Sequence, residues 1–120
     1  MCGLTGFLDS QLSSPDEIER IVSSMASTLV HRGPDDVGTW IDAQSGIALG
    51  HRRLSVIDLS KAGHQPMESK GERYILAFNG EIYNHLELRK KLEEFGRDNC
   101  IWKGTSVTET LLTAIETWGI

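Results

Sequence analysis

The chain has 120 residues, 39% of them hydrophobic, which is enough for one small domain with a buried core. Its net charge of -5 comes from mixed acidic and basic residues without a long basic block, so we expect no nucleic-acid partner. No stretch approaches the roughly 20 apolar residues that span a bilayer, and no secretory signal is present, so we expect no membrane partner. Cys2 and Cys100 have no CxxC spacing and suit a reducing compartment, which predicts a cytoplasmic protein.

The N-terminal third predicts a strand followed by a helix. Residues 2–8 (CGLTGFL) form an apolar run of strand length. Ser14 and Glu17 form a capping-box pattern around Pro15, which predicts that a helix begins there. We expect this helix to end near His31, because Gly33 can adopt a left-handed cap conformation.

The middle of the chain predicts strands. Residues 37–41 and 47–57 read as a hairpin joined by a turn at 44–46. A polar loop over 58–71 precedes residues 73–79 (RYILAFN), whose alternating apolar pattern favours another strand.

Two helices are predicted in the C-terminal third. Asn84 and Glu87 are expected to cap a helix that runs to about Phe95. Ser106 and Glu109 repeat the capping-box pattern ahead of a last helix that ends at 118–119.

Cys2 has two interpretations. It is either a small apolar residue that begins a buried strand, or, once Met1 is removed, an N-terminal nucleophile. A thiol is strongly nucleophilic, and an α-amine with a pKa near 8 can accept its proton without a separate histidine. On this residue alone the structural interpretation is favoured.

Asn79, Gly80 and Arg53 are similarly open to two interpretations. The Asn-Gly pair favours a type I′ hairpin turn, yet an asparagine amide beside an unobstructed backbone N–H also suits an oxyanion hole. Arg53 lies in a cationic stretch of predicted strand, and its planar guanidinium could bind an α-carboxylate in bidentate fashion. The four histidines have no metal-ligand spacing, so we expect no metal and no cofactor in this segment. Cys100 is interpreted as an apolar structural residue.

The chain contains, in order, the segments MCGLTGF, HRGPDD, LGHRRLSVIDLS, GHQPM, FNGEIYN and TETLL. In their order and spacing they resemble the glutaminase domain of class II glutamine amidotransferases, specifically the asparagine synthetase type. The resemblance runs from Met1 to Ile120 and implies one type 2 glutamine amidotransferase domain over 1–120. It also implies an α+β fold, the N-terminal nucleophile hydrolase sandwich of two mostly antiparallel sheets between helical layers.

The resemblance assigns a role to each matching residue. Cys2 would attack the side-chain amide of glutamine and form a thioester, with its own amine as base, while Asn79 and Gly80 would form the oxyanion hole. Arg53 would bind the substrate α-carboxylate. Residues that would line the glutamine pocket are Glu81, Val56 and Ile57.

Two departures from the family pattern matter. The family usually has Ser-Asp-Thr-Glu where this chain has Ser106-Val107-Thr108-Glu109, and that aspartate pairs with the α-ammonium of glutamine. Val107 accepts no hydrogen bond, which predicts glutamine affinity weakened by roughly ten- to a hundredfold. The family domain also continues for several more strands into a synthetase domain that uses Mg-ATP and aspartate. We therefore expect an incomplete sandwich that unfolds with little cooperativity.

The leading hypothesis is a glutamine-hydrolysing domain that supplies ammonia to a synthetase domain, in cis or in trans, with a homodimer as the candidate assembly. The alternatives are a non-catalytic remnant or binding module, an amidotransferase for another acceptor, and a structural domain with a redox-sensing thiol at Cys2.

Overall fold

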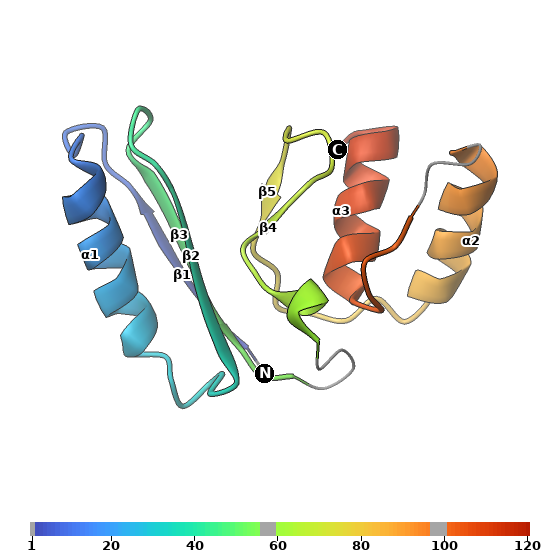
Figure 1. Cartoon of the computed structure of the whole chain (residues 1–120), viewed down its shortest axis with the longest axis horizontal. Coiled ribbons are helices and arrows are strands. Elements are labelled where there is room, and N and C mark those ends of the chain that lie inside the picture. The colour runs from blue at the N-terminus through green and yellow to red at the C-terminus, as the bar shows by residue number, and fades with distance from the viewer. Residues whose placement is uncertain (1, 56–59, 97–100) are drawn as a thin grey trace. The chain divides into compact units, whose positions relative to one another are not determined.

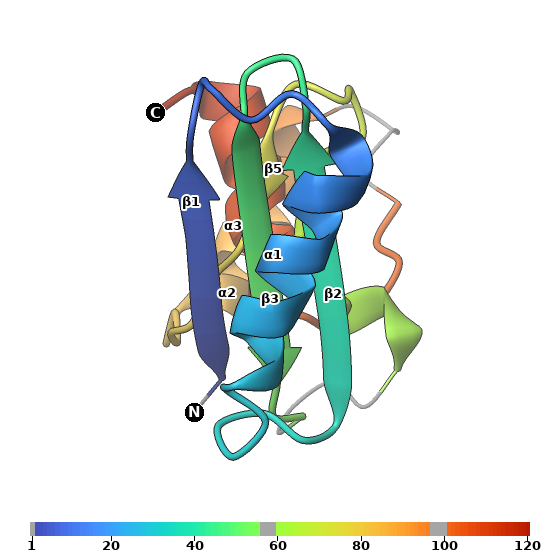
Figure 2. The ribbon, with the colours of Figure 1, turned by 90° about the vertical axis from the view of Figure 1, so that its left-hand side faces the viewer.

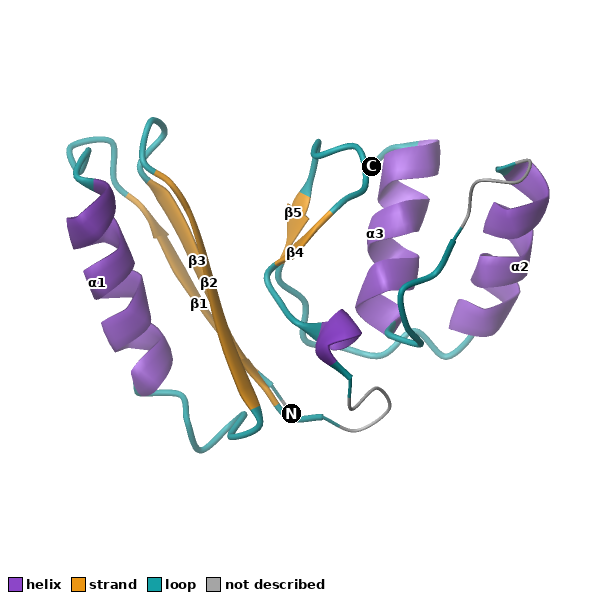
Figure 3. Cartoon of the chain, in the orientation of Figure 1, coloured by secondary structure: helices purple, strands orange, loops and turns teal. Residues whose placement is uncertain are grey.

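A computed structural model describes residues 2–55, 60–96 and 101–120. Its elements, drawn in Figures 1 and 3, divide into two compact units. The sheet unit comprises the described residues of Met1–Ser55, His64–Pro66 and Ala77–Asn79. The helical unit comprises those of Val56–Gly63, Met67–Leu76 and Gly80–Ile120. Antiparallel sheets combined with helices confirm the α+β class.

The sheet unit contains an antiparallel sheet of three strands, β1 (Gly3–Leu8), β2 (Asp36–Asp42) and β3 (Ile47–Arg53), in the order β1-β3-β2. Helix α1 (Pro15–Ser27) lies across one face of this sheet, as Figure 2 shows. The predicted first strand, first helix and β2–β3 hairpin are therefore confirmed.

The core of the sheet unit is apolar. Ile18 and Val22 lie four residues apart on one face of α1, and both are fully buried against Ala48 of β3. Gly50 lies on the same face of β3, where an added Cβ would come within 3.2 Å of Val22 Cγ2. Because side chains alternate along a strand, His51 and Arg53 belong to the opposite face of β3.

The helical unit contains a short hairpin of β4 (Met67–Glu68) and β5 (Ile75–Leu76), a 3-10 turn η1 (Lys61–Gly63) and two helices. The helices are α2 (His85–Phe95) and α3 (Val107–Trp118), and α3 packs against both β4 and α2. The predicted C-terminal helices are confirmed, and their ends differ little from expectation.

The first helix is shorter than predicted. It ends at Ser27 rather than near His31, because Thr28 N–H bonds Met25 O at 3.2 Å and the Thr28 hydroxyl donates to the same carbonyl at 2.8 Å. Gly33 has no positive φ and does not form a left-handed cap. Instead, an added Cβ at Gly33 would lie 2.3 Å from the Arg52 carbonyl, so close approach to β3 requires glycine there.

The strand predictions in the middle of the chain need correction. Strand β3 stops at Arg53, and residues 56–57 lie outside the described part of the chain. Of residues 73–79, only Ile75–Leu76 is strand, paired with a segment of the predicted loop. A local turn explains this hairpin, because the Ser69 hydroxyl accepts from Arg73 N and Tyr74 N at 3.2 and 3.3 Å.

The capping predictions hold at only one helix. The side chains of Ser14 and Asn84 make no cap hydrogen bond, whereas Ser106 Oγ accepts from Thr108 N at 3.2 Å. Glu109 does not complete the capping box. Its carboxylate accepts from the N–H groups of Lys103 and Gly104 instead, at 2.7 and 3.1 Å.

Candidate functional site

Cys2 lies directly before β1 and is half-buried. Its Sγ accepts a hydrogen bond from Leu54 N–H at 3.3 Å and contacts Leu54 O at 3.7 Å. Because β1 and β3 are antiparallel, the start of β1 meets the end of β3, where Arg53 precedes Leu54. The structure therefore brings the predicted nucleophile and the predicted carboxylate-binding arginine to the same end of one sheet.

The end of β3 is held by the HRGPDD segment, to which the sequence analysis assigned a helix end but no role at a functional site. Gly33 packs on the Arg52 backbone, and Asp35 N–H donates to Arg53 O at 3.0 Å. The Asp35 carboxylate also accepts from Ser55 N–H at 2.7 Å. These contacts fix the backbone on both sides of Arg53, whose own side chain is largely buried. The sequence signal for this role was the HRGPDD segment, which is one of the quoted family motifs.

Asn79 belongs to the same unit, in a segment without regular secondary structure over 77–79. Phe78 N–H donates to Gln65 Oε1 at 2.6 Å, which ties this segment to residues 64–66. A type I′ turn needs positive φ at both central residues, and neither Asn79 nor Gly80 has it. The hairpin-turn interpretation of the Asn-Gly pair is therefore wrong.

Two histidines flank this region. His51, on β3, is 1% exposed and hydrogen-bonds to the backbone of Phe78. Burial lowers the pKa of His51 below its ordinary 6.5, against the opposing effects of the Phe78 hydrogen bond and of Asp36. His64 Nδ1 lies 2.7 Å from Asp36 Oδ2, and both side chains are partly exposed. Neither histidine was selected from the sequence, although both lie in the quoted segments LGHRRLSVIDLS and GHQPM.

The remaining predicted residues are distributed differently. Gly80 and Glu81 are exposed and belong to the helical unit. Val107 also belongs to that unit, where it is the first residue of α3 and is 7% exposed. Val56 and Ile57 lie outside the described residues.

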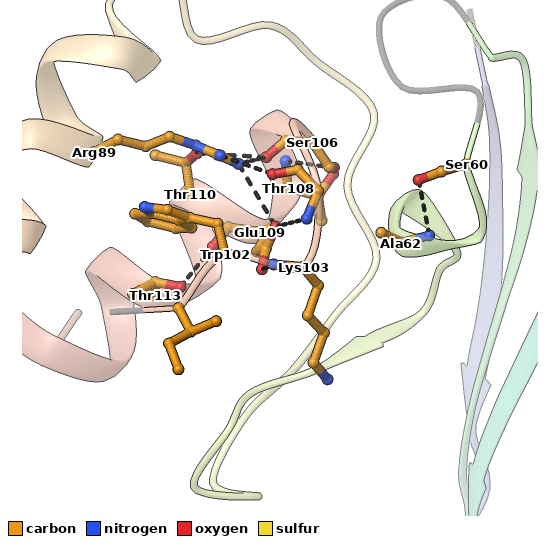
Figure 4. A network of polar contacts seen from close by, with 12 residues as sticks. Ser60, Ala62, Arg89, Trp102, Lys103, Ser106, Thr108, Glu109, Thr110 and Thr113 are labelled. Carbon is orange, nitrogen blue, oxygen red and sulfur yellow. Dashed lines mark hydrogen bonds and ion pairs between the residues drawn. The ribbon is translucent and has the colours of Figure 1, made fainter. Parts of the chain in front are cut away.

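A buried polar network holds the segment that leads into Val107 (Figure 4). Arg89 of α2 donates through Nη1 to Gly104 O at 2.7 Å and through Nη2 to Ser106 O at 3.0 Å. Its Nε donates to Thr110 Oγ1 at 2.8 Å, and its guanidinium lies 4.2 Å from the ring centre of Trp102. This network was not predicted, because it joins residues that are 13 to 21 positions apart from Arg89.

Glu109 completes the network from the other side. Its carboxylate lies 3.6 Å from Arg89 Nη2, and its side chain is slightly more buried than that of the arginine. Glu109 accepts from the backbone N–H groups of Lys103 and Gly104, while Arg89 donates to backbone carbonyls of the same 103–106 segment. The backbone before Val107 is thus fixed by side chains from α2 and α3.

Membrane-spanning helices and clusters of metal-ligating side chains are both absent from the described part of the chain. None of its helices is long and apolar enough to cross a membrane. Within the same residues, no group of three or more His, Cys, Asp and Glu side chains converges as a metal site would require.

Comparison with known proteins agrees with the motif order. The family model described as "Glutamine amidotransferase domain" matches residues 1–120. Asparagine synthetase [glutamine-hydrolyzing] 3 of Bacillus subtilis is 38% identical over 120 residues, which cover 98% of this chain and 18% of the relative. Asparagine synthetase [glutamine-hydrolyzing] 1 of the same organism is 42% identical over 97 residues, 80% of this chain and 15% of the relative. A putative asparagine synthetase [glutamine-hydrolyzing] of Mycobacterium bovis is 35% identical and covers 99% of this chain and 20% of the relative. The chain thus spans a fifth or less of the length of these curated relatives.

Proposed function

The chain belongs to the glutamine amidotransferase domain family, and we propose that it hydrolyses glutamine to glutamate and ammonia through a thioester on Cys2. The observation that carries this proposal is the placement of Cys2 Sγ beside Leu54, next to Arg53 on the neighbouring strand. A nucleophile and a carboxylate-binding group at one end of a rigid sheet suit a substrate that carries an amide and an α-carboxylate.

The reaction begins when removal of Met1 frees the α-amine of Cys2. The amine takes the thiol proton, and the thiolate attacks the side-chain amide carbon of glutamine. The tetrahedral intermediate collapses, the C–N bond breaks, and the nitrogen takes the proton from the amine and leaves as ammonia. Water then attacks the thioester carbonyl, which releases glutamate and regenerates the thiol.

The other residues bind substrate or stabilise charge. Asn79 Nδ2 and Gly80 N–H would donate to the oxyanion of the tetrahedral intermediate. The absence of a type I′ turn at these two residues supports this role. Arg53 would hold the α-carboxylate, and its backbone braces through Asp35 support that role. Glu81, with Val56 and Ile57, would line the side-chain pocket.

The wider context of the chain is also part of the proposal. We assign 1–120 as the N-terminal portion of an N-terminal nucleophile hydrolase sandwich. Its ammonia would reach a synthetase domain that amidates aspartate with Mg-ATP, in a protein that forms homodimers. The names of the relatives, asparagine synthetase [glutamine-hydrolyzing], support the coupling of glutamine hydrolysis to asparagine synthesis.

Covalent trapping tests the proposal. The chain is treated with a glutamine analogue that carries a diazoketone in place of the amide, and its intact and peptide masses are measured. We expect one adduct per chain, located on Cys2 of protein that lacks Met1, together with glutamate release from glutamine. Cys2→Ala should lose both signals, and the matched control Cys100→Ala should keep both. Labelling of Cys100 alone, or no labelling in a folded chain, would overturn the proposal.

Val107 favours a second candidate function, a non-catalytic binding module of the same family. The residue is buried at the start of α3 and offers no acceptor for the α-ammonium of glutamine. The same trapping experiment decides between the two functions, since a module that does not bind glutamine leaves Cys2 unlabelled by the analogue.

A further inference from the structure

His51 is a buried titratable side chain to which the proposed mechanism assigns no step. It is 1% exposed, and its Nε2 is buried without a hydrogen-bond partner among the described residues. Its hydrogen bond to the Phe78 backbone is therefore made through Nδ1. This bond favours the protonated ring, which identifies the imidazole as donor and the Phe78 carbonyl as acceptor.

Both backbone polar groups of Phe78 thus have side-chain partners in the sheet unit. The carbonyl accepts from His51 of β3, and the N–H donates to Gln65 Oε1 at 2.6 Å. Phe78 lies outside any strand, so no sheet ladder holds it. Two side chains fix its peptide planes instead, and the second of these planes leads into Asn79.

We propose that His51 is a positioning residue which, together with Gln65, fixes the backbone of Phe78 and so sets the direction of the oxyanion-hole donor Asn79. This inference rests on the proposed function, because it assigns to Asn79 the role of stabilising the tetrahedral intermediate. An oxyanion-hole donor acts only when it lies within hydrogen-bond distance of the developing charge, so a small rotation at Phe78 reduces its contribution.

The proposal requires a neutral ring with its proton on Nδ1. The charged and titratable groups that act on His51 are Asp36, which raises its pKa, and Arg53 and His64, which lower it; burial is the largest single cause, and the pKa is lowered. Protonation would add an N–H at Nε2, where no acceptor lies among the described groups. The neutral Nδ1–H form is consequently the one that this environment stabilises.

Three variants separate positioning from packing. His51→Asn keeps a donor near the place of Nδ1, whereas His51→Gln shifts the donor toward the place of Nε2 and His51→Leu removes it. The exposed His31, changed to leucine, is the matched control. Steady-state glutamine hydrolysis is measured at a temperature where circular dichroism shows every variant to be folded.

We expect kcat to fall by about ten- to a hundredfold in the Leu and Gln variants, with KM changed by less than about threefold, because the oxyanion forms only in the transition state. The Asn variant should stay within about threefold of the unchanged chain, since it retains the donor. Equal losses in all three variants would show that His51 only fills space, and an unchanged kcat in the Leu variant would overturn the inference outright.

A second measurement does not depend on catalysis. The ¹⁵N NMR shifts of His51 in the unchanged chain should show Nδ1 protonated and Nε2 unprotonated at pH 7.5. The opposite tautomer would overturn the inference even in an active protein. An unchanged chain that hydrolyses no glutamine overturns the proposed function, and the tautomer then still decides whether His51 holds Phe78.

Discussion

The sheet unit and the helical unit are stabilised by different kinds of contact. The side chains buried between α1 and the sheet are apolar, with Ile18, Val22 and Ala26 of α1 fully buried. In the helical unit the buried run at the start of α3 is mostly polar, and Arg89 and Glu109 satisfy the backbone around it. An apolar core loses stability in proportion to the volume removed, whereas a buried ionic network loses it when one partner is removed.

The two units also place their candidate functional residues in different ways. In the sheet unit, the pairing of β1 with β3 sets Cys2 beside the end of β3, so backbone register is the main cause of its placement. In the helical unit, the segment before Val107 has no regular structure, and side chains from two helices hold it.

The largest expected effect is in the apolar core. Ile18→Ala should lower the free energy of unfolding of the sheet unit by about 4 kcal/mol, because it leaves a cavity in a fully buried site. Urea denaturation followed by hydrogen exchange in β3 measures this loss. Val30→Ala, at a half-exposed site, is the control and should change stability by less than about 0.5 kcal/mol. A similarly small loss for Ile18→Ala would contradict an apolar core at this position.

Arg89→Gln tests the polar network. We expect a loss of about 3 kcal/mol in the helical unit, since the carbonyls of Gly104 and Ser106 lose their donors and Glu109 stays buried without its counter-charge. Hydrogen exchange of α3 amides is the measurement, and Lys90→Gln on the exposed side of α2 is the matched control. If both variants exchange at the same rate, the network contributes no stability and the contrast between the units fails.

Val107→Asp concerns ligand binding and follows from the proposed function. A carboxylate at this position could accept a charge-assisted hydrogen bond from the α-ammonium of glutamine, and it would lie favourably at the N-terminus of α3. We expect glutamine affinity to rise by about ten- to a hundredfold, measured by calorimetry with Cys2→Ala to prevent turnover. Val107→Asn, which is similar in size but uncharged, should give a smaller gain. An unchanged Kd in the Asp variant would remove position 107 from the substrate site.

The smallest expected effect is a pH dependence of the sheet unit. Burial lowers the pKa of His51 in the folded state, so above about pH 6.5 the ring is neutral in both the folded and the unfolded chain. Below that pH the unfolded chain binds a proton that the folded chain resists, and the free energy of unfolding decreases until the folded-state pKa is reached. The free energy of unfolding is measured for the unchanged chain and for His51→Asn between pH 8 and pH 5. As the pH falls, the unchanged chain should lose stability relative to the variant. A constant difference would mean that His51 titrates normally.

Local patterns predicted most of the regular structure. The apolar run at 2–8, the hairpin around Gly46 and the three helices each follow from periodicity and turn chemistry within a few neighbouring residues. The order of the motifs likewise identified the family that the comparison found. These features depend on short stretches of chain, which is why the amino-acid sequence by itself determines them.

The exceptions arise where distant groups compete for the same atoms. Glu109 was predicted to cap its own helix. Its carboxylate instead accepts from the N–H groups of Lys103 and Gly104 and lies close to the Arg89 guanidinium. Gly33 was predicted to end a helix and instead allows the chain to pass close over Arg52. His51 carried no local signal at all, since its partner Phe78 lies 27 positions further along the chain. The sequence alone determined most of the helices and strands and predicted the chemistry proposed for Cys2. Tertiary structure decided which side chains surround that residue, because buried polar groups find partners by proximity in space rather than along the chain.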